Sequence, residues 1–230
     1  MTTLHYIFDP LCGWCYAAAP LVAAARAVPG LAVAFHGGGM MTGPQRRAIT
    51  PQWREYVLPH DRRIAQVSGQ PFGQAYFEGL LRDTGAVMDS APPTTAALAA
   101  EELGARGLDM IHRLQRAHYV EGRRIAEPAV LQQLAEDLGL DGKAFAEAFA
   151  RLAGTATQQH FEASRHWLAR AGGHGFPTFA LEQPGGQLTA LDIGPWLGRP
   201  EAWATHLAGQ VPASPAGADA FACGPDGCAL

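Results

Sequence analysis

Positive charge is scarce in this chain. Lys143 is the only lysine among 230 residues, and lysine and arginine together number 17 against 21 aspartates and glutamates. The formal net charge at pH 7 is therefore −4. Proteins that bind nucleic acids or anionic membranes carry an excess of positive charge, so the composition argues against both partners.

The sequence also lacks an apolar run long enough to span a bilayer, and it does not open with a basic segment followed by an apolar stretch. We therefore expect a cytoplasmic protein with no membrane partner. Only four of the 230 residues are cysteines. Because structural disulfides are rare in the cytoplasm, any disulfide in this chain is expected to be transient and catalytic.

Metal-binding and phosphate-binding motifs are missing too. The nine histidines lack metal-site spacing, and the glycine-rich residues 37–43 lack the lysine-serine ending of a phosphate-binding loop. We predict no metal and no cofactor. For His36 and His174, near the ends of predicted strands, a solvated or hydrogen-bonded role is favoured over that of a base. The arginine pairs at residues 46–47, 62–63 and 123–124 are interpreted as solvated surface.

The most informative feature that is present is the sequence Cys-Gly-Trp-Cys at residues 12–15, between an apolar run (residues 4–8) and a helix-forming run (residues 16–26). Two cysteines three positions apart on a helix are neighbours and can form a disulfide. The free N–H groups at a helix start favour a thiolate. We predict that Cys12, the more exposed thiol, is the nucleophile and that Cys15 is the resolving thiol.

Other interpretations of this motif exist. A C-x-x-C also fits half of a zinc site or a chance pair of buried cysteines. The preceding strand, the following helix and the absence of a second C-x-x-C favour redox chemistry. Asp9, just before the cysteine loop, either helps to move the Cys15 proton or anchors the turn.

The order of predicted elements indicates one sheet interrupted by helices. A second strand at residues 31–35 completes a parallel β-α-β unit, and residues 51–171 have helical patterns throughout. Within them, Thr94 or Thr95 is predicted to cap a helix, Pro128 to begin one and Asp141 to cap another. Two strands follow at residues 176–181 and 187–191, and a last helix covers residues 195–208.

This order, with the C-x-x-C motif and the sequence Gly-Phe-Pro-Thr-Phe at residues 175–179, resembles the DsbA-like thioredoxin-fold family, and within it the FrnE-like cytoplasmic branch. The resemblance extends from about Leu4 to Ala208. It implies an α/β, thioredoxin-like fold with a large all-helical insertion. We expect a discontinuous thioredoxin-like domain (residues 1–42 and 172–210), a helical insertion domain (43–171) and a flexible C-terminal tail (211–230).

The resemblance also implies roles for individual residues. Pro177 matches the family's cis-proline, which places the backbone of Phe176 where it can pair with an extended substrate. Trp14 either helps to bind apolar substrate segments or is a partly buried helix residue. The dipeptide Gly13-Trp14 departs from the Pro-His of periplasmic oxidases, so a strongly oxidising character is not carried over.

The predicted function is that of a thiol-disulfide oxidoreductase or isomerase that acts on protein disulfides through Cys12 and Cys15 by mixed-disulfide exchange. Its expected partners are protein or peptide thiols and disulfides, with glutathione or a thioredoxin-type reductant. One alternative is a zinc-binding or chaperone-like module that uses the same cysteines. Another is a glutathione-dependent isomerase of small aromatic molecules, a branch that generally lacks the second cysteine.

The tail contains a second cysteine pair. Residues 211–220 are small residues and prolines typical of a linker, and a Gly-Pro-Asp-Gly turn sequence separates Cys223 from Cys228. We interpret this pair as a second redox centre that exchanges electrons with Cys12 and Cys15. Two alternatives remain: the four cysteines bind one zinc ion, or the tail pair is inert.

The relay predicts that replacing both Cys223 and Cys228 by serine changes the redox transition of the first pair. A titration against reduced and oxidised glutathione, with thiols trapped by alkylation and counted by mass, measures that transition. Unchanged turnover of protein substrates after the chain is cut at Gly209 would contradict the relay.

Overall fold

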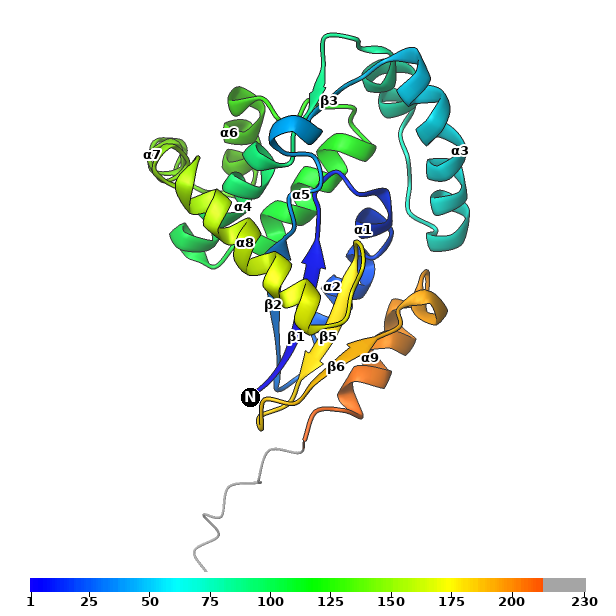
Figure 1. Ribbon diagram of the computed structural model, residues 1–230, viewed down its shortest axis with the longest axis vertical. Helices are drawn as coiled ribbons and strands as arrows, with labels where there is room; N and C mark the ends of the chain where they lie inside the picture. Colours follow the sequence, from blue (N-terminus) through cyan, green and yellow to red (C-terminus); the bar gives the residue numbers. More distant parts are fainter. Residues whose placement is uncertain (213–230) are drawn as a thin grey trace, which may run out of the picture.

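Strands from both ends of the chain form one four-stranded sheet in a computed structural model, which describes residues 1–212 (Figure 1). The tail pair Cys223 and Cys228 lies outside the described residues. The first two strands are parallel and the last two are antiparallel to their neighbours, which confirms the predicted single interrupted sheet. In sheet order the strands are β2 (Leu31–Gly37), β1 (Thr2–Phe8), β5 (Thr178–Glu182) and β6 (Leu188–Leu191).

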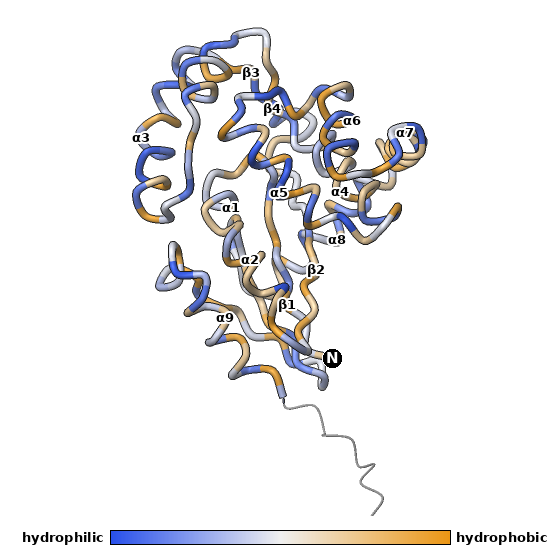
Figure 2. The backbone as a smooth tube through the Cα atoms, turned by 180° about the vertical axis from the view of Figure 1, so that it is seen from behind, coloured by the Kyte–Doolittle hydropathy of each residue, from blue (hydrophilic) through white to orange (hydrophobic). Residues whose placement is uncertain are grey.

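Helices cover both faces of this sheet. Helix α8 (Thr155–Arg170) crosses one face, and α1 (Gly13–Ala17), α2 (Ala19–Arg26) and α9 (Pro200–Ala208) lie on the other (Figures 1 and 2). Successive side chains of a strand point to opposite faces of the sheet, so alternate residues of β1 face α8 and the rest face α1, α2 and α9. The residues that form the core with α2 and α9 include Leu4, Tyr6, Phe8, Phe179, Leu181, Trp203 and Leu207.

The helix after the cysteines is shorter than expected. The helix-forming run at residues 16–26 is divided between α1 and α2, with a break at Ala18. Pro20 explains the break, because a proline has no N–H to donate to the carbonyl four residues earlier. That carbonyl, on Tyr16, instead accepts a hydrogen bond from Gln70 Nε2 at 3.1 Å.

The region between β2 and α8 is mostly helical but not wholly so. Two short segments, β3 (Arg47–Ala48) and β4 (Val87–Met88), pair antiparallel. Because β4 lies within residues 51–171, the expectation of helix throughout that range was wrong there. The region has its own core, which includes Leu114, Leu131 and Phe145. Its other elements are η1 (Gly43–Gln45), α3 (Pro51–Ser68), the π-helical η2 (Ala75–Gly79), η3 (Leu80–Arg82), α4 (Ala91–Gly104), α5 (Gly107–Tyr119), α6 (Pro128–Asp137) and α7 (Gly142–Leu152).

Two of the three predicted helix starts are correct. Helix α6 begins at Pro128, and the Asp141 side chain accepts from the Ala144 N–H at 2.8 Å to cap α7. Neither Thr94 nor Thr95 caps α4, because the helix already begins at Ala91 with two prolines in its first turn. Both threonines are buried inside the helix instead.

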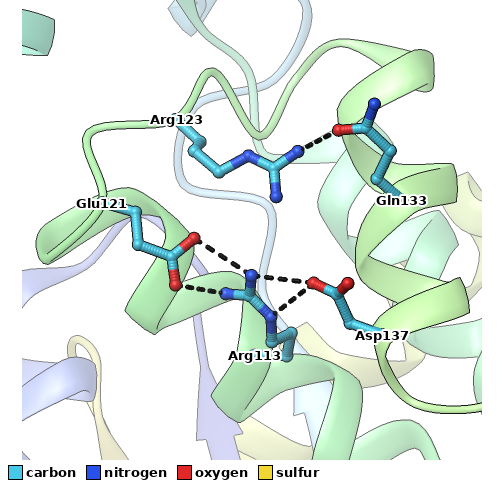
Figure 3. Close-up of polar contacts among 5 residues, drawn as sticks. All are labelled: Arg113, Glu121, Arg123, Gln133 and Asp137. Atoms are coloured by element: carbon cyan, nitrogen blue, oxygen red, sulfur yellow. Dashed lines mark hydrogen bonds and ion pairs between the residues drawn. The ribbon is translucent and has the colours of Figure 1, made fainter.

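A cluster of polar side chains joins α5 to α6 (Figure 3). Arg113 donates to both oxygens of Glu121, at 2.7 and 3.0 Å, and to Asp137 on α6 at 2.9 Å. Nearby, Arg123 donates to Gln133. Exposed ion pairs stabilise a protein only slightly, but an arginine that donates to both oxygens of a carboxylate restricts how the two side chains are oriented. The cluster therefore fixes the end of α5, whose last residue, Tyr119, reaches the cavity described below.

Helix α8 covers a buried histidine on β1, His5, and a half-buried one on β2, His36. His5 Nδ1 lies 2.9 Å from His36 Nε2, and the ring of Trp167 stacks on His5 at 3.9 Å. The other ring nitrogen of His5 lies 3.1 Å from Glu182. Burial first, and then the adjacent His5 and His160, lower the pKa of His36 to about 3. The packing of α8 therefore favours neutral histidines.

Helix α8 thus packs on the sheet although its residues fall within the predicted insertion. The division of the chain at residues 42/43 and 171/172 stays a prediction. No helix within residues 1–212 is both long enough and apolar enough to cross a membrane.

We predict that His36→Gln reduces the loss of stability at acid pH. An unfolded histidine has a pKa of ~6.5, whereas that of native His36 is about 3. As pH falls through this window the unfolded state binds the proton first, so native His36 costs about 1.4 kcal/mol per pH unit. Urea unfolding at pH 7 to 4 measures the difference, with His166→Gln, at an exposed position on α8, as the control. If the free energy of unfolding changed equally with pH in wild type and His36→Gln, the lowered pKa of His36 would be contradicted.

Candidate active site

The two cysteines lie where β1 passes into the first turn of α1. Cys12 is the N-cap residue, with extended backbone angles, and its carbonyl accepts from the N–H groups of Cys15 (3.0 Å) and Tyr16 (3.1 Å). Both thiols are free. Cys12 is 8% exposed and Cys15 is fully buried, which agrees with the expected order of exposure.

The surroundings of Cys15 keep its thiol protonated. Burial raises the pKa of the Cys15 thiol well above its usual range, and the adjacent Cys12 raises it further. The Asp9 N–H donates to Cys15 Sγ at 3.4 Å. Cys15 is therefore a poor first nucleophile, and its position one turn inside the helix suits a thiol that attacks Cys12 from behind.

Asp9 anchors the loop that carries the cysteines. Its carboxylate is fully buried and accepts from the N–H of Leu11 at 2.9 Å, the N–H of Met40 at 2.6 Å and the hydroxyl of Ser90 at 2.9 Å. Burial raises the pKa of Asp9 to about 6. One of the two predicted roles, anchoring the turn, is thus present in the structure. Transfer of the Cys15 proton stays a prediction.

The Phe176–Pro177 peptide bond is cis, as the family resemblance implies. The Cys12 thiol lies 3.4 Å from the carbonyl oxygen of Phe176 and donates to it. The Phe176 ring packs on Gly38, where an added Cβ would lie only 2.0 Å from the ring. The glycine-rich loop after β2 therefore permits the close approach of Phe176, which explains its composition without any bound phosphate.

A cavity of about 580 Å³ opens beside Cys12. Its walls come from the cysteine loop, α3, the strands β3 and β4, η2 and the end of α5. Trp14 lines it and is half-buried, so both of its predicted environments are present. The lining is mostly apolar, and it consists of Leu11, Cys12, Gly13, Trp14, Met40, Met41, Gln45, Arg47, Trp53, Tyr56, Val57, His60, Asp61, Ile64, Tyr76, Met88 and Tyr119.

Sequence reasoning missed Asp61, which lines this cavity. Asp61 is 5% exposed, and its Oδ2 accepts from the Tyr76 hydroxyl at 2.8 Å. Burial raises the pKa of Asp61 to about 6. A signal was available, because Asp61 follows Trp53 and Val57 at intervals of four residues and shares their face of α3.

The other residues considered from the sequence lie elsewhere or have a different environment. His36 lies under α8 and His174 is exposed, and neither lines the cavity beside Cys12. Arg47, expected on the solvated surface, is exposed but also forms part of the cavity wall. Within residues 1–212 no group of three or more histidine, cysteine, aspartate or glutamate side chains is placed to hold a metal ion.

Helix α3 presses on the cysteine loop at Gly13. A Cβ at this position would lie 2.8 Å from Ile64 Cδ1 and 3.0 Å from Asp61 Oδ1. A contact of 2.8 Å requires the end of the Ile64 side chain to shift. The dipeptide between the cysteines is thus fitted to the helix that forms the cavity wall.

We predict that Gly13→Ala lowers the free energy of unfolding by roughly 1–3 kcal/mol, because the added methyl overpacks this contact. Ile64→Val removes Cδ1 and should restore part of the loss in the double variant. Gly185→Ala is the control, because an added Cβ there meets nothing within 4 Å. Thermal or urea unfolding measures all four proteins. A Gly13→Ala variant as stable as wild type would show that α3 does not constrain the loop.

Comparisons with known proteins agree with this geometry. Residues 3–193 match the DSBA-like thioredoxin domain family. The cytosolic disulfide reductase DsbM from Pseudomonas aeruginosa is 58% identical, with a TM-score of 0.85, over 90% of this chain and 98% of that one. A structure of DsbM with GSH gives 56% identity and a TM-score of 0.84 over the same shares.

A 2-hydroxychromene-2-carboxylate isomerase has the same fold at 16% identity, with a TM-score of 0.55 over 90% of this chain and 97% of that one. None of the curated proteins compared matches the sequence. The narrower resemblance to the FrnE-like branch stays a prediction. The expected thioredoxin-like fold, with helices inserted between its strands, is confirmed. This chain belongs to the DSBA-like thioredoxin domain family.

Proposed function

We propose that this protein is a thiol-disulfide oxidoreductase that works as a disulfide reductase in the cytoplasm, with glutathione as its thiol partner. The observation that carries the proposal is the unequal placement of the two thiols. Cys12 lines the cavity, whereas Cys15 is fully buried one turn behind it. DsbM is described as a cytosolic disulfide reductase and has a structure with GSH. The similarity to it supports three parts of the proposal: electron flow toward the substrate disulfide, a cytoplasmic location, and glutathione as the thiol partner.

The reaction consists of two exchanges at sulfur. The Cys12 thiolate attacks one sulfur of the substrate disulfide, a mixed disulfide forms, and the first substrate thiolate leaves and takes up a proton. The Cys15 thiolate then attacks the Cys12 sulfur, and the second substrate thiol is released. Two electrons pass from the dithiol to the substrate, and the enzyme is left with a Cys12–Cys15 disulfide.

Two molecules of glutathione return the enzyme to its dithiol form. The first glutathione thiolate attacks Cys12 and releases Cys15 as a thiol. The second attacks the glutathione sulfur of the mixed disulfide, which releases Cys12 and yields glutathione disulfide. Because burial raises the pKa of Cys15, this thiol takes up a proton when it leaves Cys12 and must give one up when it attacks Cys12.

Two further residues, Trp14 and Phe176, are proposed to bind the substrate, and Pro177 to position Phe176. Trp14 lines the cavity and offers an aromatic surface beside the reactive sulfur. The Phe176 backbone, turned by the cis bond to Pro177, lies next to Cys12, where an extended segment can pair with it. Reduction of protein disulfides as well as small ones at this position would show a broad range of substrates, with glutathione as the reductant for both.

The central test compares Cys12→Ser and Cys15→Ser with wild type. Cys12→Ser should abolish reduction of disulfides, because the nucleophile is lost. Cys15→Ser should keep the first exchange and accumulate a mixed disulfide between Cys12 and glutathione, which intact-protein mass spectrometry detects.

Two other outcomes would overturn the proposal. Full turnover by Cys15→Ser on small aromatic substrates would favour the glutathione-dependent isomerase. Stoichiometric zinc in freshly purified protein, with thiols that react only after chelation, would favour the zinc-binding alternative.

A further inference from the structure

Two side chains of opposite charge line the cavity beside Cys12. Arg47, on β3, is exposed, and Asp61, on α3, is buried. The reductase chemistry proposed above uses neither of them. Their positions on the walls of one cavity raise the question of what ligand they select.

Arg47 is held in place without a carboxylate partner. Its guanidinium carbon lies 4.6 Å from the centre of the Trp53 ring, a distance at which the ring face attracts a cation. Within the described residues no acidic side chain forms an ion pair with Arg47, whereas the adjacent Arg46 pairs with Asp89 at 3.4 Å. A guanidinium with free N–H groups binds a carboxylate in bidentate fashion.

Asp61 has one oxygen available to a ligand. Tyr76 donates to Oδ2, while Oδ1 faces Gly13 with no hydrogen-bond donor among the described residues. A carboxylate taken out of water needs donors to offset the desolvation cost. An ammonium or amide N–H of a bound molecule would supply one beside the cysteine loop.

The wall between these two charges is apolar. Trp53, Val57 and Ile64 line it on α3, and Met88 lines it on β4. The cavity of about 580 Å³ is of the size that encloses a small molecule. A ligand that fills it therefore presents an apolar or sulfur-containing middle, a carboxylate toward Arg47 and an N–H donor toward Asp61.

We propose that Arg47 and Asp61 form a subsite that selects disulfides of small zwitterionic peptides for attack by Cys12. Glutathione disulfide is the probe for a single exchange with the reduced protein, because with glutathione as the reductant its turnover gives no net reaction. Arg47 binds a carboxylate of the ligand, and Asp61 accepts from its ammonium or amide group. The two contacts place the ligand sulfur at Cys12. This inference rests on the proposed reductase function and names its substrate class.

The test measures single-turnover rates of fully reduced protein against increasing disulfide, with intrinsic tryptophan fluorescence as the signal. Glutathione disulfide is the zwitterionic probe and bis(2-hydroxyethyl) disulfide is the uncharged one. Arg47→Gln and Asp61→Asn should each raise the half-saturating concentration of glutathione disulfide about tenfold and leave its maximal rate nearly unchanged. Rates with the uncharged disulfide should stay within about twofold. Arg46→Gln is the matched control and should behave as wild type.

A charge reversal gives a gain of function that a folding defect cannot imitate. Arg47→Glu changes an exposed residue, and it should speed the reaction with cystamine, a disulfide with two ammonium groups, while slowing that with glutathione disulfide. Equal effects of Asp61→Asn on charged and uncharged disulfides would overturn its role in recognition. Equal effects of Arg46→Gln and Arg47→Gln would overturn that of Arg47. A wild-type protein that reacts with neither disulfide would overturn the proposed function, and this inference with it.

Discussion

The buried carboxylate of Asp9 holds the active site together. Its three hydrogen bonds, from Leu11, Met40 and Ser90, join the cysteine loop, the loop after β2 and the start of α4. These segments are distant in sequence and have no long strand or helix in common. A buried carboxylate is stable only when donors surround it, so the three segments are fixed relative to one another by the cost of leaving it unpaired.

The helical region between β2 and α8 forms much of the wall of the cavity beside Cys12. The last residue of α5, Tyr119, and the inner face of α3 enclose the cavity in front of Cys12. Gly13 is where this helical region meets the loop, since a side chain there would collide with α3. The chemistry thus depends on a thioredoxin-like sheet for the thiols and on the inserted helices for the walls around them.

Sequence patterns correctly predicted the structural features that depend on residues close together in the chain. The C-x-x-C at a strand-helix junction, the parallel β1–β2 pair and the caps at Pro128 and Asp141 depend on residues close in sequence. The sequence did not predict that Asp61 and Arg47 line the cavity, because the cavity is formed by tertiary packing. In the sequence each of them lies beside another charged residue, a pattern typical of the surface. The break in the helix at Ala18 was missed although Pro20 was visible, since a proline in a first turn is compatible with one helix or with two.

The contact between Cys12 and Phe176 has a consequence for the synthesis of the protein. The two residues are 164 positions apart, so the cysteine leaves the ribosome long before the carbonyl that it contacts. At a translation rate of about 5–20 residues per second, the interval is roughly 10–30 s. Throughout it the growing chain carries two thiols without their final surroundings. During that interval either thiol can react before the carbonyl that contacts Cys12 is in place.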